Sequence, residues 1–222
     1  MTPKAASAPS TMRSAGARRP RPRARRGEGD RLRDEILDAA EALLLETGSA
    51  DKVSTRAVAS RVGVSSPSLY LHFPDRASLL FEVCQRQFDK LAVLLAAACE
   101  GIDDPVERLR AIGEAYCRFA IDNPQQYRTM MMDVVSGVAY EKDLDEMRAE
   151  VGFDIVLRAV TDGIEAGVFA TDHDPLLVAF AFWCSAHGLV SLMIAKPSIG
   201  WGDPTALIDA VLGQTLDGVR AR

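Results

Sequence analysis

Apolar side chains recur every three or four positions through most of the chain from residue 30 onward, which is the spacing of one face of an α-helix. The first such stretch runs from about Asp30 to Thr47 and ends at Gly48, a residue suited to the turn after a helix. No stretch alternates apolar and polar residues in the way of a half-buried strand. The pattern therefore predicts an all-α protein.

Two short helices are predicted next, over about 55–62 and 66–73. Ser54 or Thr55 caps the first of them, and Gly63 breaks the chain between the two. Helices of this length are not stable alone, so they must pack on each other and on their neighbours. A pair of short helices joined by a tight turn is typical of a helix-turn-helix.

A long helix is predicted from Asp75 towards Cys99, and later helix starts are marked by an Asp or Asn directly before a proline. The polar side chain can cap the helix, and proline fits its first position because the N–H it lacks has no partner there. These pairs are Asp104-Pro105, Asn123-Pro124, Asp174-Pro175 and Asp203-Pro204. The chain should hold about nine helices.

Charge divides the chain unequally. Residues 1–29 hold eight bases and one acid, a net +7, so the remainder carries −12 of the total of −5. This Arg- and Pro-rich arm has almost no large apolar side chain and is predicted to be disordered. A basic arm suggests a polyanionic partner. Its role is open between attraction to the DNA backbone, reach into a minor groove, and a plain spacer.

The stretch 175–195 contains 21 consecutive residues without Asp, Glu, Lys or Arg. A helix that is apolar all round either spans a membrane or is buried by protein on every side. The stretch includes Trp183, Ser185 and His187, which counts against a membrane span. We favour the buried helix of a cytoplasmic protein without membrane contact, because a helix-turn-helix implies a cytosolic DNA-binding protein. The membrane-anchored interpretation remains the alternative.

The sequence contains no motif that indicates an enzyme or a metal-binding protein. The four cysteines are scattered without a Cys-x-x-Cys pair, and the three histidines lack metal-ligand spacing. No nucleophile–base pair or Gly-rich phosphate loop is recognisable. We therefore predict no metal, no cofactor and no catalytic residues, with an enzyme or small-molecule carrier as the rival class.

The segment from Ser54 to Arg76 carries the functional prediction. Between Lys52 and Phe73 there are three bases and no acid, in an otherwise acidic chain. The outward face of the second short helix should enter a major groove, with Ser68 and Leu71 at base edges and Tyr70 and His72 at phosphates. The predicted DNA-binding residues are Thr55, Arg56, Ser65, Ser66, Pro67, Ser68, Tyr70, Leu71, His72 and Arg76. As alternatives, Tyr70 and His72 are plain surface residues, and Arg76 pairs with Asp75 or Glu82.

This segment resembles the N-terminal domain of the TetR (tetracycline-repressor) family over roughly residues 31–80. The resemblance rests on Thr55, Val58-Ala59, Gly63-Val64-Ser65, Leu69-Tyr70-Leu71-His72-Phe73, Arg76 and Leu79-Leu80. Arg76 stands where the family usually has lysine. Further on, Trp183, His187 and Gly188 resemble the Trp-x-x-x-His-Gly signature of the WHG-type C-terminal domain. The resemblance implies a homodimeric repressor whose C-terminal helices bind a small molecule and release DNA.

Two sets of C-terminal residues are candidates for those roles. A small-molecule effector site is predicted at Phe119, Tyr127, Met130, Met131, Trp183 and His187. For each of these residues singly, filling of the core or an interface is the alternative. A dimer interface is predicted at the small-residue stripe and the final helix, through Cys184, Gly188, Ser191, Ala195, Leu207 and Val211.

The predicted architecture has three parts: a disordered arm over 1–29, a three-helix DNA-binding domain over 30–76, and an antiparallel helical bundle over 77–222 that binds ligand and dimerises. Two heads related by a two-fold axis imply double-stranded DNA with a palindromic operator. The sequence leaves repression and activation open.

Overall fold

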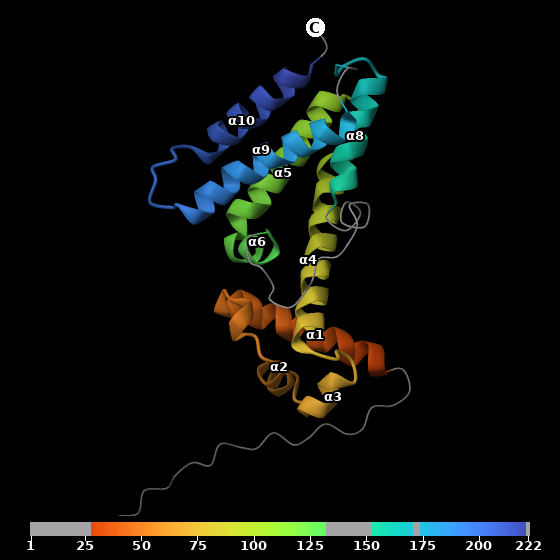
Figure 1. Ribbon diagram of the computed structural model, residues 1–222, viewed down its shortest axis with the longest axis vertical. Helices are drawn as coiled ribbons and strands as arrows, with labels where there is room; N and C mark the ends of the chain where they lie inside the picture. The colour runs from red at the N-terminus through yellow and green to blue at the C-terminus, as the bar shows by residue number, and fades with distance from the viewer. Residues whose placement is uncertain (1–27, 132–151, 171–173, 221–222) are drawn as a thin grey trace, which may run out of the picture.

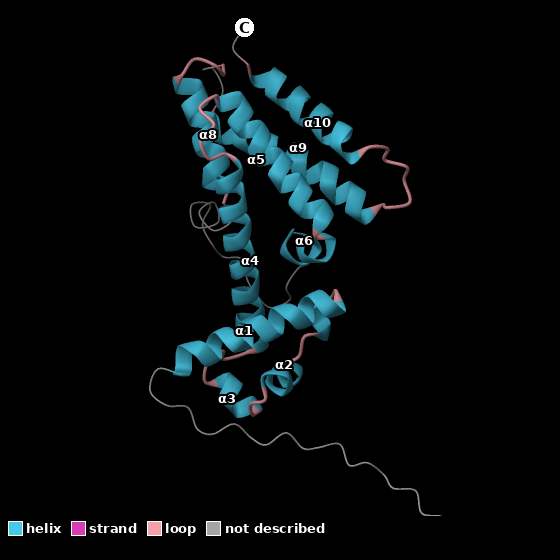
Figure 2. Ribbon diagram, turned by 180° about the vertical axis from the view of Figure 1, so that it is seen from behind, coloured by secondary structure: helices cyan, strands magenta, loops and turns pink. Residues whose placement is uncertain are grey.

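The computed structural model describes residues 28–131, 152–170 and 174–220. All of its regular elements are helices, and Figure 2 shows no strand in these ranges. They are α1 (Glu28–Thr47), the 3-10 helix η1 (Ala50–Lys52), α2 (Thr55–Val62), α3 (Ser66–Tyr70), α4 (Arg76–Ala98), α5 (Pro105–Asp122), α6 (Pro124–Met131), α8 (Phe153–Glu165), α9 (Pro175–Ala195) and α10 (Pro204–Val219). The all-α prediction is confirmed.

Capping side chains begin most of the helices as predicted. Asp104, Asp174 and Asp203 each accept a hydrogen bond from a backbone N–H in the first turn of the helix that follows. Asp75 does the same for α4, through the N–H of Ser78. Asn123 differs, because its side-chain Nδ2 donates to the carbonyl of Phe119 at the end of α5. Its amide therefore ends one helix, where the sequence predicted that it would begin the next.

The buried apolar side chains form two separate cores. One core joins α1, α2, α3 and the first half of α4. The second joins the rest of α4 with α5, α6, α8, α9 and α10. Figure 1 shows these as a small head and a larger body, with α4 running from one to the other. The predicted head and bundle are both present, and we use these two names below.

The head and the body meet within α4. The predicted boundary between residues 76 and 77 falls at the start of this helix, whereas the head core continues to Cys84 and the body core begins at Phe88. Gln87 lies between them with its amide buried, and it accepts a hydrogen bond from Gln126 of α6. The oxygen of this buried amide has a partner across the boundary, whereas its Nε2 is buried without a hydrogen bond to the described residues.

Residues 1–27 of the predicted basic arm lie outside the described residues. Helix α1 begins at Glu28, two residues earlier than predicted. At the other end of the chain, α9 is long and apolar enough to cross a membrane, by length and composition. Only 39% of its most apolar window is buried within the single chain. The prediction that protein buries this helix on every side therefore requires a second covering surface.

Candidate functional site

The helix-turn-helix is built from two short helices around a glycine turn. Ser54 caps α2 by accepting from the N–H of Ala57, and Gly63 ends it with φ 82°, a left-handed conformation that favours glycine. Ser65 then caps α3. Ala59 and Leu69 are buried between the helices, which leaves the opposite side of α3 facing outward.

The outward side of α3 displays uncharged side chains. Leu71 is 85% exposed and Tyr70 is 50% exposed, and Pro67 is also exposed. A single exposed leucine is common on protein surfaces, so what distinguishes this side of α3 is that Pro67, Tyr70 and Leu71 are exposed together without an acid among them. The helix itself ends at Tyr70, earlier than the predicted Phe73, and Leu71 and His72 continue as a turn.

Hydrogen bonds hold several of the predicted DNA-binding side chains in place. The hydroxyls of Thr55 and Tyr70 lie 3.4 Å apart, joining the start of α2 to the end of α3. The hydroxyls of Ser65 and Ser68 lie 2.8 Å apart at the start of α3. Each pair is exposed, so these hydroxyls can also meet an outside partner.

The bases of the head have different surroundings. Arg61 forms a two-point ion pair with Glu46 of α1, at 2.7 and 2.5 Å, and this hydrogen bonding lowers the pKa of the Glu46 carboxyl. Arg61 is thus a clamp between α1 and α2. Lys52 and Arg56 are exposed and keep the basic character of the outer face.

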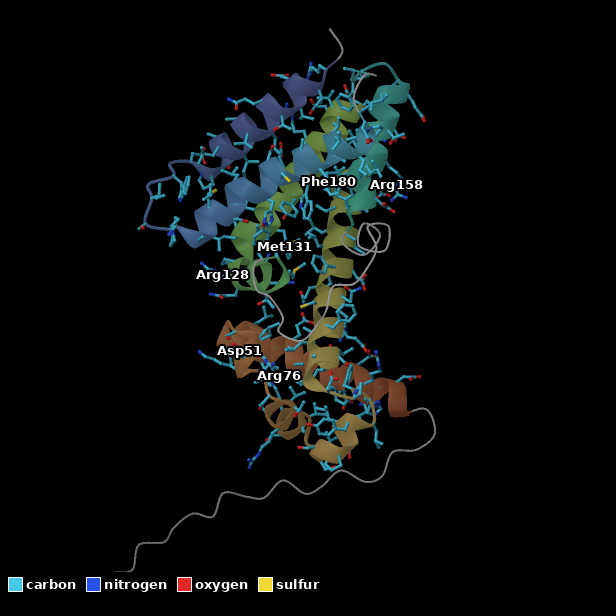
Figure 3. The ribbon with its side chains drawn as sticks, in the orientation of Figure 1. Asp51, Arg76, Arg128, Met131, Arg158 and Phe180 are labelled. Carbon is cyan, nitrogen blue, oxygen red and sulfur yellow. The ribbon has the colours of Figure 1, made fainter. Side chains whose placement is uncertain are left out.

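Arg76 is occupied by backbone groups, which the sequence did not predict. Its Nε donates to the carbonyl of Val53 at 2.8 Å, and its Nη2 donates to the carbonyl of Ala50. Nη2 also lies 3.8 Å from the carboxylate of Asp51, its neighbour in Figure 3. Arg76 therefore holds η1 and the following turn against the start of α4, and its ion-pair partner is neither Asp75 nor Glu82.

A second polar site lies inside the body, where three helices bring together four side chains. The hydroxyls of Tyr116 on α5 and Tyr127 on α6 lie 3.0 Å apart. His187 on α9 places its Nδ1 3.0 Å from the first and 2.6 Å from the second. Its Nε2 lies 3.2 Å from the hydroxyl of Ser191. We call these four residues the polar network.

Burial sets the electrostatics of the polar network. Removal from water raises the pKa of both tyrosines and lowers the pKa of His187, because burial penalises each charged form. The imidazole is therefore neutral at physiological pH, with one nitrogen donating and the other accepting. Ser191 was predicted for the dimer interface, but its hydroxyl lies on the network.

A cavity adjoins the polar network between α4, α5, α8 and α9. Tyr116, Trp183 and Ala186 line it together with Phe153 and Phe182. Its free space is about 20 Å³, room for roughly one water molecule. The ring of Trp183 is 5.9 Å from that of His187 and 5.9 Å from that of Phe153. Aromatic side chains thus fill most of the space beside the network.

The structure brings together only half of the predicted effector residues. Tyr127, Trp183 and His187 lie at the polar network and its cavity. Phe119 and Met131 pack in or against the body core, and Met130 lines a different small cavity, where α6 meets α1 and α4. The sequence analysis missed Tyr116. Its signal was a tyrosine on the apolar face of α5, since a buried phenol needs a hydrogen-bond partner.

The predicted dimer residues lie along an uncovered side of α9 and α10, which are neighbours in Figures 1 and 2. Cys184 and Ala195 are exposed on α9, and Gly188 is half-buried between them. Leu177 and Leu192 of the same helix are 66% and 54% exposed. On α10, Leu207 and Val211 are half-buried beside the covered Ile208 and Leu212. This surface accounts for the poor burial of α9.

Known proteins resemble both parts of the chain. Residues 36–83 match the family model of bacterial regulatory proteins of the tetR family, and residues 109–215 match the tetracycline-repressor-like C-terminal domain. The HTH-type transcriptional activator FasR of Mycolicibacterium smegmatis is 32% identical over 163 residues, which cover 70% of this chain and 73% of FasR. The nucleoid occlusion factor SlmA of Photobacterium profundum is 31% identical over 98 residues, 44% of this chain and 50% of SlmA.

Solved structures share the fold. A protein of unknown function from Rhodococcus sp. RHA1 superposes with a TM-score of 0.72 at 24% identity, covering 86% of this chain and 95% of that one. A bacterial regulatory protein of the tetR family from Rhodococcus RHA1 gives 0.63 at 20% identity, with 86% and 98% covered. The C-terminal match names no subtype, so the WHG assignment stays a prediction. With both domains matched in order, the chain belongs to the TetR family of DNA-binding transcription regulators, which are not enzymes.

Proposed function

We propose that this chain is a cytoplasmic, homodimeric repressor that binds a palindromic operator and is released from it by a small molecule. The observation that carries the DNA-binding part is the acid-free outer face of α3, where Tyr70 and Leu71 are exposed at the tip of the head. Two such heads fixed by one dimer would meet half-sites about one helical turn apart, or a multiple of it.

The outer face divides into groups that read bases and groups that hold phosphates. Leu71 is placed to contact a thymine methyl, and Ser68 a base edge, beside Pro67. The paired hydroxyls of Thr55 and Tyr70 suit a phosphate, as do His72 and the N–H groups near Ser65 and Ser66. Arg56 adds an exposed charge. Arg76 can contribute only through Nη1, the nitrogen that its turn does not use.

Dimerisation is proposed along the uncovered side of α9 and α10. Small side chains at Cys184, Gly188 and Ala195 allow another helix to approach closely, and the exposed leucines of α9 supply apolar area. A second copy placed there would bury the helix that a single chain leaves half open. Isologous contact of this kind produces the two-fold symmetry that a palindrome requires.

Release is proposed to start at the cavity beside the polar network. Helix α6 lies between this site and the head: its Tyr127 bonds His187, and its Gln126 bonds Gln87 on α4. A ligand that prefers another position of α6 would shift the population towards a head spacing that no longer fits the operator. FasR is named an activator, so a reporter gene under the operator decides whether this chain represses.

The test is selection of bound DNA from a random duplex pool by the full chain, repeated with Tyr70→Ala and Arg76→Ala. We expect the wild type to enrich one palindromic motif. Tyr70→Ala should weaken binding by about fivefold, the value of one hydrogen bond of about 1 kcal/mol. No enriched motif, or enrichment indifferent to both substitutions, would overturn the DNA-reading role of α3.

A further inference from the structure

The cavity of the body has walls without charge. Among its described lining residues, only Tyr116 and Trp183 carry polar side-chain atoms, and none is Asp, Glu, Lys or Arg. Leu95 of α4, Val156 of α8 and Phe182 of α9 are typical of the rest. A charged group brought into such a site loses its water without gaining a counter-charge, which is strongly unfavourable.

Of the four residues of the polar network, Tyr116 is the one that also lines this cavity. In one proton arrangement Tyr116 donates to Tyr127, Tyr127 donates to Nδ1 of His187, and Nε2–H donates to Ser191. In the reverse arrangement Ser191 donates to Nε2, Nδ1–H to Tyr127, and Tyr127 to Tyr116. Both keep the imidazole neutral. In the first arrangement the Tyr116 hydroxyl uses its proton on Tyr127 and can only accept from a ligand, whereas in the second it accepts from Tyr127 and can donate to a ligand.

We infer that the cavity binds an uncharged, mainly apolar molecule whose single polar group bonds the Tyr116 hydroxyl at the end of the polar network. Either a hydroxyl or a neutral carbonyl suits the site, because the network can reverse its protons to match. This inference rests on the proposed effector site and adds the chemical class of the effector.

Entry requires side chains to move, since the free space holds about one water molecule. Trp183 is the one described lining side chain that is partly exposed, and its ring lies against those of Phe153 and His187. Displacing this ring opens the cavity and couples occupancy to the network through His187. The emission of Trp183 should therefore report binding.

The groups that face His187 distinguish neutral from charged ligands. They are Tyr116 from α5, Tyr127 from α6, and Trp183 and Ser191 from its own helix, all uncharged at neutral pH. An anionic ligand could be balanced only by protonating the imidazole, and burial opposes this by lowering its pKa. Affinity for an anion would then rise as the pH falls, whereas affinity for a neutral ligand should not change.

The test uses three probes on one skeleton at pH 7.5: 4-phenyl-1-butanol, 4-phenylbutyrate and 4-phenylbutylamine. Binding to the full chain is followed by tryptophan emission and by the melting temperature. We expect the alcohol to bind and both charged probes to bind at least about tenfold more weakly, because their charge must be desolvated. Tyr116→Phe, which keeps the ring, should weaken the alcohol about fivefold. Thr161→Val on α8, which removes a hydroxyl bonded to the Leu157 carbonyl of its own helix and absent from the cavity lining, is the control and should leave the alcohol affinity unchanged.

Three results would overturn the inference: no binding by any probe, a charged probe that binds as tightly as the alcohol, or alcohol binding that Tyr116→Phe leaves unchanged. A parallel measurement of operator binding separates this from the proposed function. If the alcohol binds but DNA is not released, the inference about the cavity is supported and the proposed release of DNA by an effector is contradicted. Release by the carboxylate alone supports effector release and contradicts the uncharged class.

Discussion

The head and the body place their polar side chains differently around their cores. The head core, from Ile36 to Cys84, is apolar, and the hydroxyl pairs of the head lie on its outer surface. The body buries two tyrosines hydrogen-bonded to a histidine inside a much larger core. An exposed polar face suits a large polyanion that stays in solvent, whereas an enclosed network suits a small molecule that leaves it. The two regions therefore divide recognition of DNA from recognition of an effector.

The largest expected effect comes from breaking the head core alone. Phe73 is fully buried there, so Phe73→Ala should lower the free energy of unfolding by about 3–5 kcal/mol. Both tryptophans, Trp183 and Trp201, lie in the body. In urea unfolding followed by far-UV circular dichroism, we expect the helices of the head to unfold at a lower urea concentration than in wild type. The midpoint followed by tryptophan emission, which reports the body, should not change. Equal shifts of both signals would show that the two cores unfold as one.

The dimer surface can be broken without disturbing the single chain. A Cβ added at Gly188 meets nothing within 4 Å, so the first carbon of the new side chain in Gly188→Leu has room in one copy. In a closely packed dimer the added side chain would overpack the contact, at about 1–3 kcal/mol in each copy. We expect sedimentation analysis to show monomers and the operator affinity to fall with them. Gly29→Leu on α1, equally open, is the control; a dimer unaffected by Gly188→Leu places the interface elsewhere.

Substitutions of Arg76 and Arg56 distinguish a residue that stabilises the head from a residue that contacts DNA. Arg76→Ala leaves the carbonyls of Ala50 and Val53 without a donor, so stability should fall by about 1–3 kcal/mol. Arg56 is exposed, so Arg56→Ala should change stability by less than about 0.5 kcal/mol. It should reduce the salt dependence of operator affinity by about one counterion. Urea unfolding measures the stability of both variants, and DNA titrations at several salt concentrations measure the salt dependence of their operator affinity. A stability loss in Arg56→Ala with a smaller salt dependence in Arg76→Ala would contradict the assignment.

The smallest effect is the pH dependence from His187. Burial lowers its pKa from the ordinary 6.5, so below that pH the unfolded chain takes up a proton that the folded chain refuses. The free energy of unfolding should therefore fall as pH decreases through 6.5, by less than about 1.4 kcal/mol per unit. His187→Gln should flatten the dependence of the melting temperature on pH between 7.5 and 5.5. Curves of equal slope in wild type and His187→Gln would contradict a buried neutral imidazole.

Local chemistry made much of this fold predictable. Asp104, Asp174 and Asp203 cap the helices that their following prolines announced, and Gly63 makes the turn between α2 and α3. Each of these features depends on neighbours within a few residues. The outward position of Leu71 also followed from helical spacing alone.

The features that escaped prediction depend on distant parts of the chain. Tyr116 and His187 are 71 positions apart, and no periodicity shows that α5 and α9 bring them together. Arg76 reaches carbonyls 23 and 26 positions earlier, a contact set by the path of the turn after α1. Spacing placed these residues on a face of their own helix, but it could not show which groups face them.

The most direct test of the account is the operator affinity of Leu71→Asp, measured by fluorescence anisotropy on the selected duplex. Leu71 is 85% exposed, so this change should leave the free energy of unfolding within about 0.5 kcal/mol of wild type. A carboxylate on this face would meet the negative charge of the groove. We predict that affinity falls about 100-fold, or about 2.8 kcal/mol, because the apolar contact of Leu71 is lost and the carboxylate is repelled by the phosphates. Unchanged affinity in a folded, dimeric variant would contradict the claim that this face of α3 reads DNA.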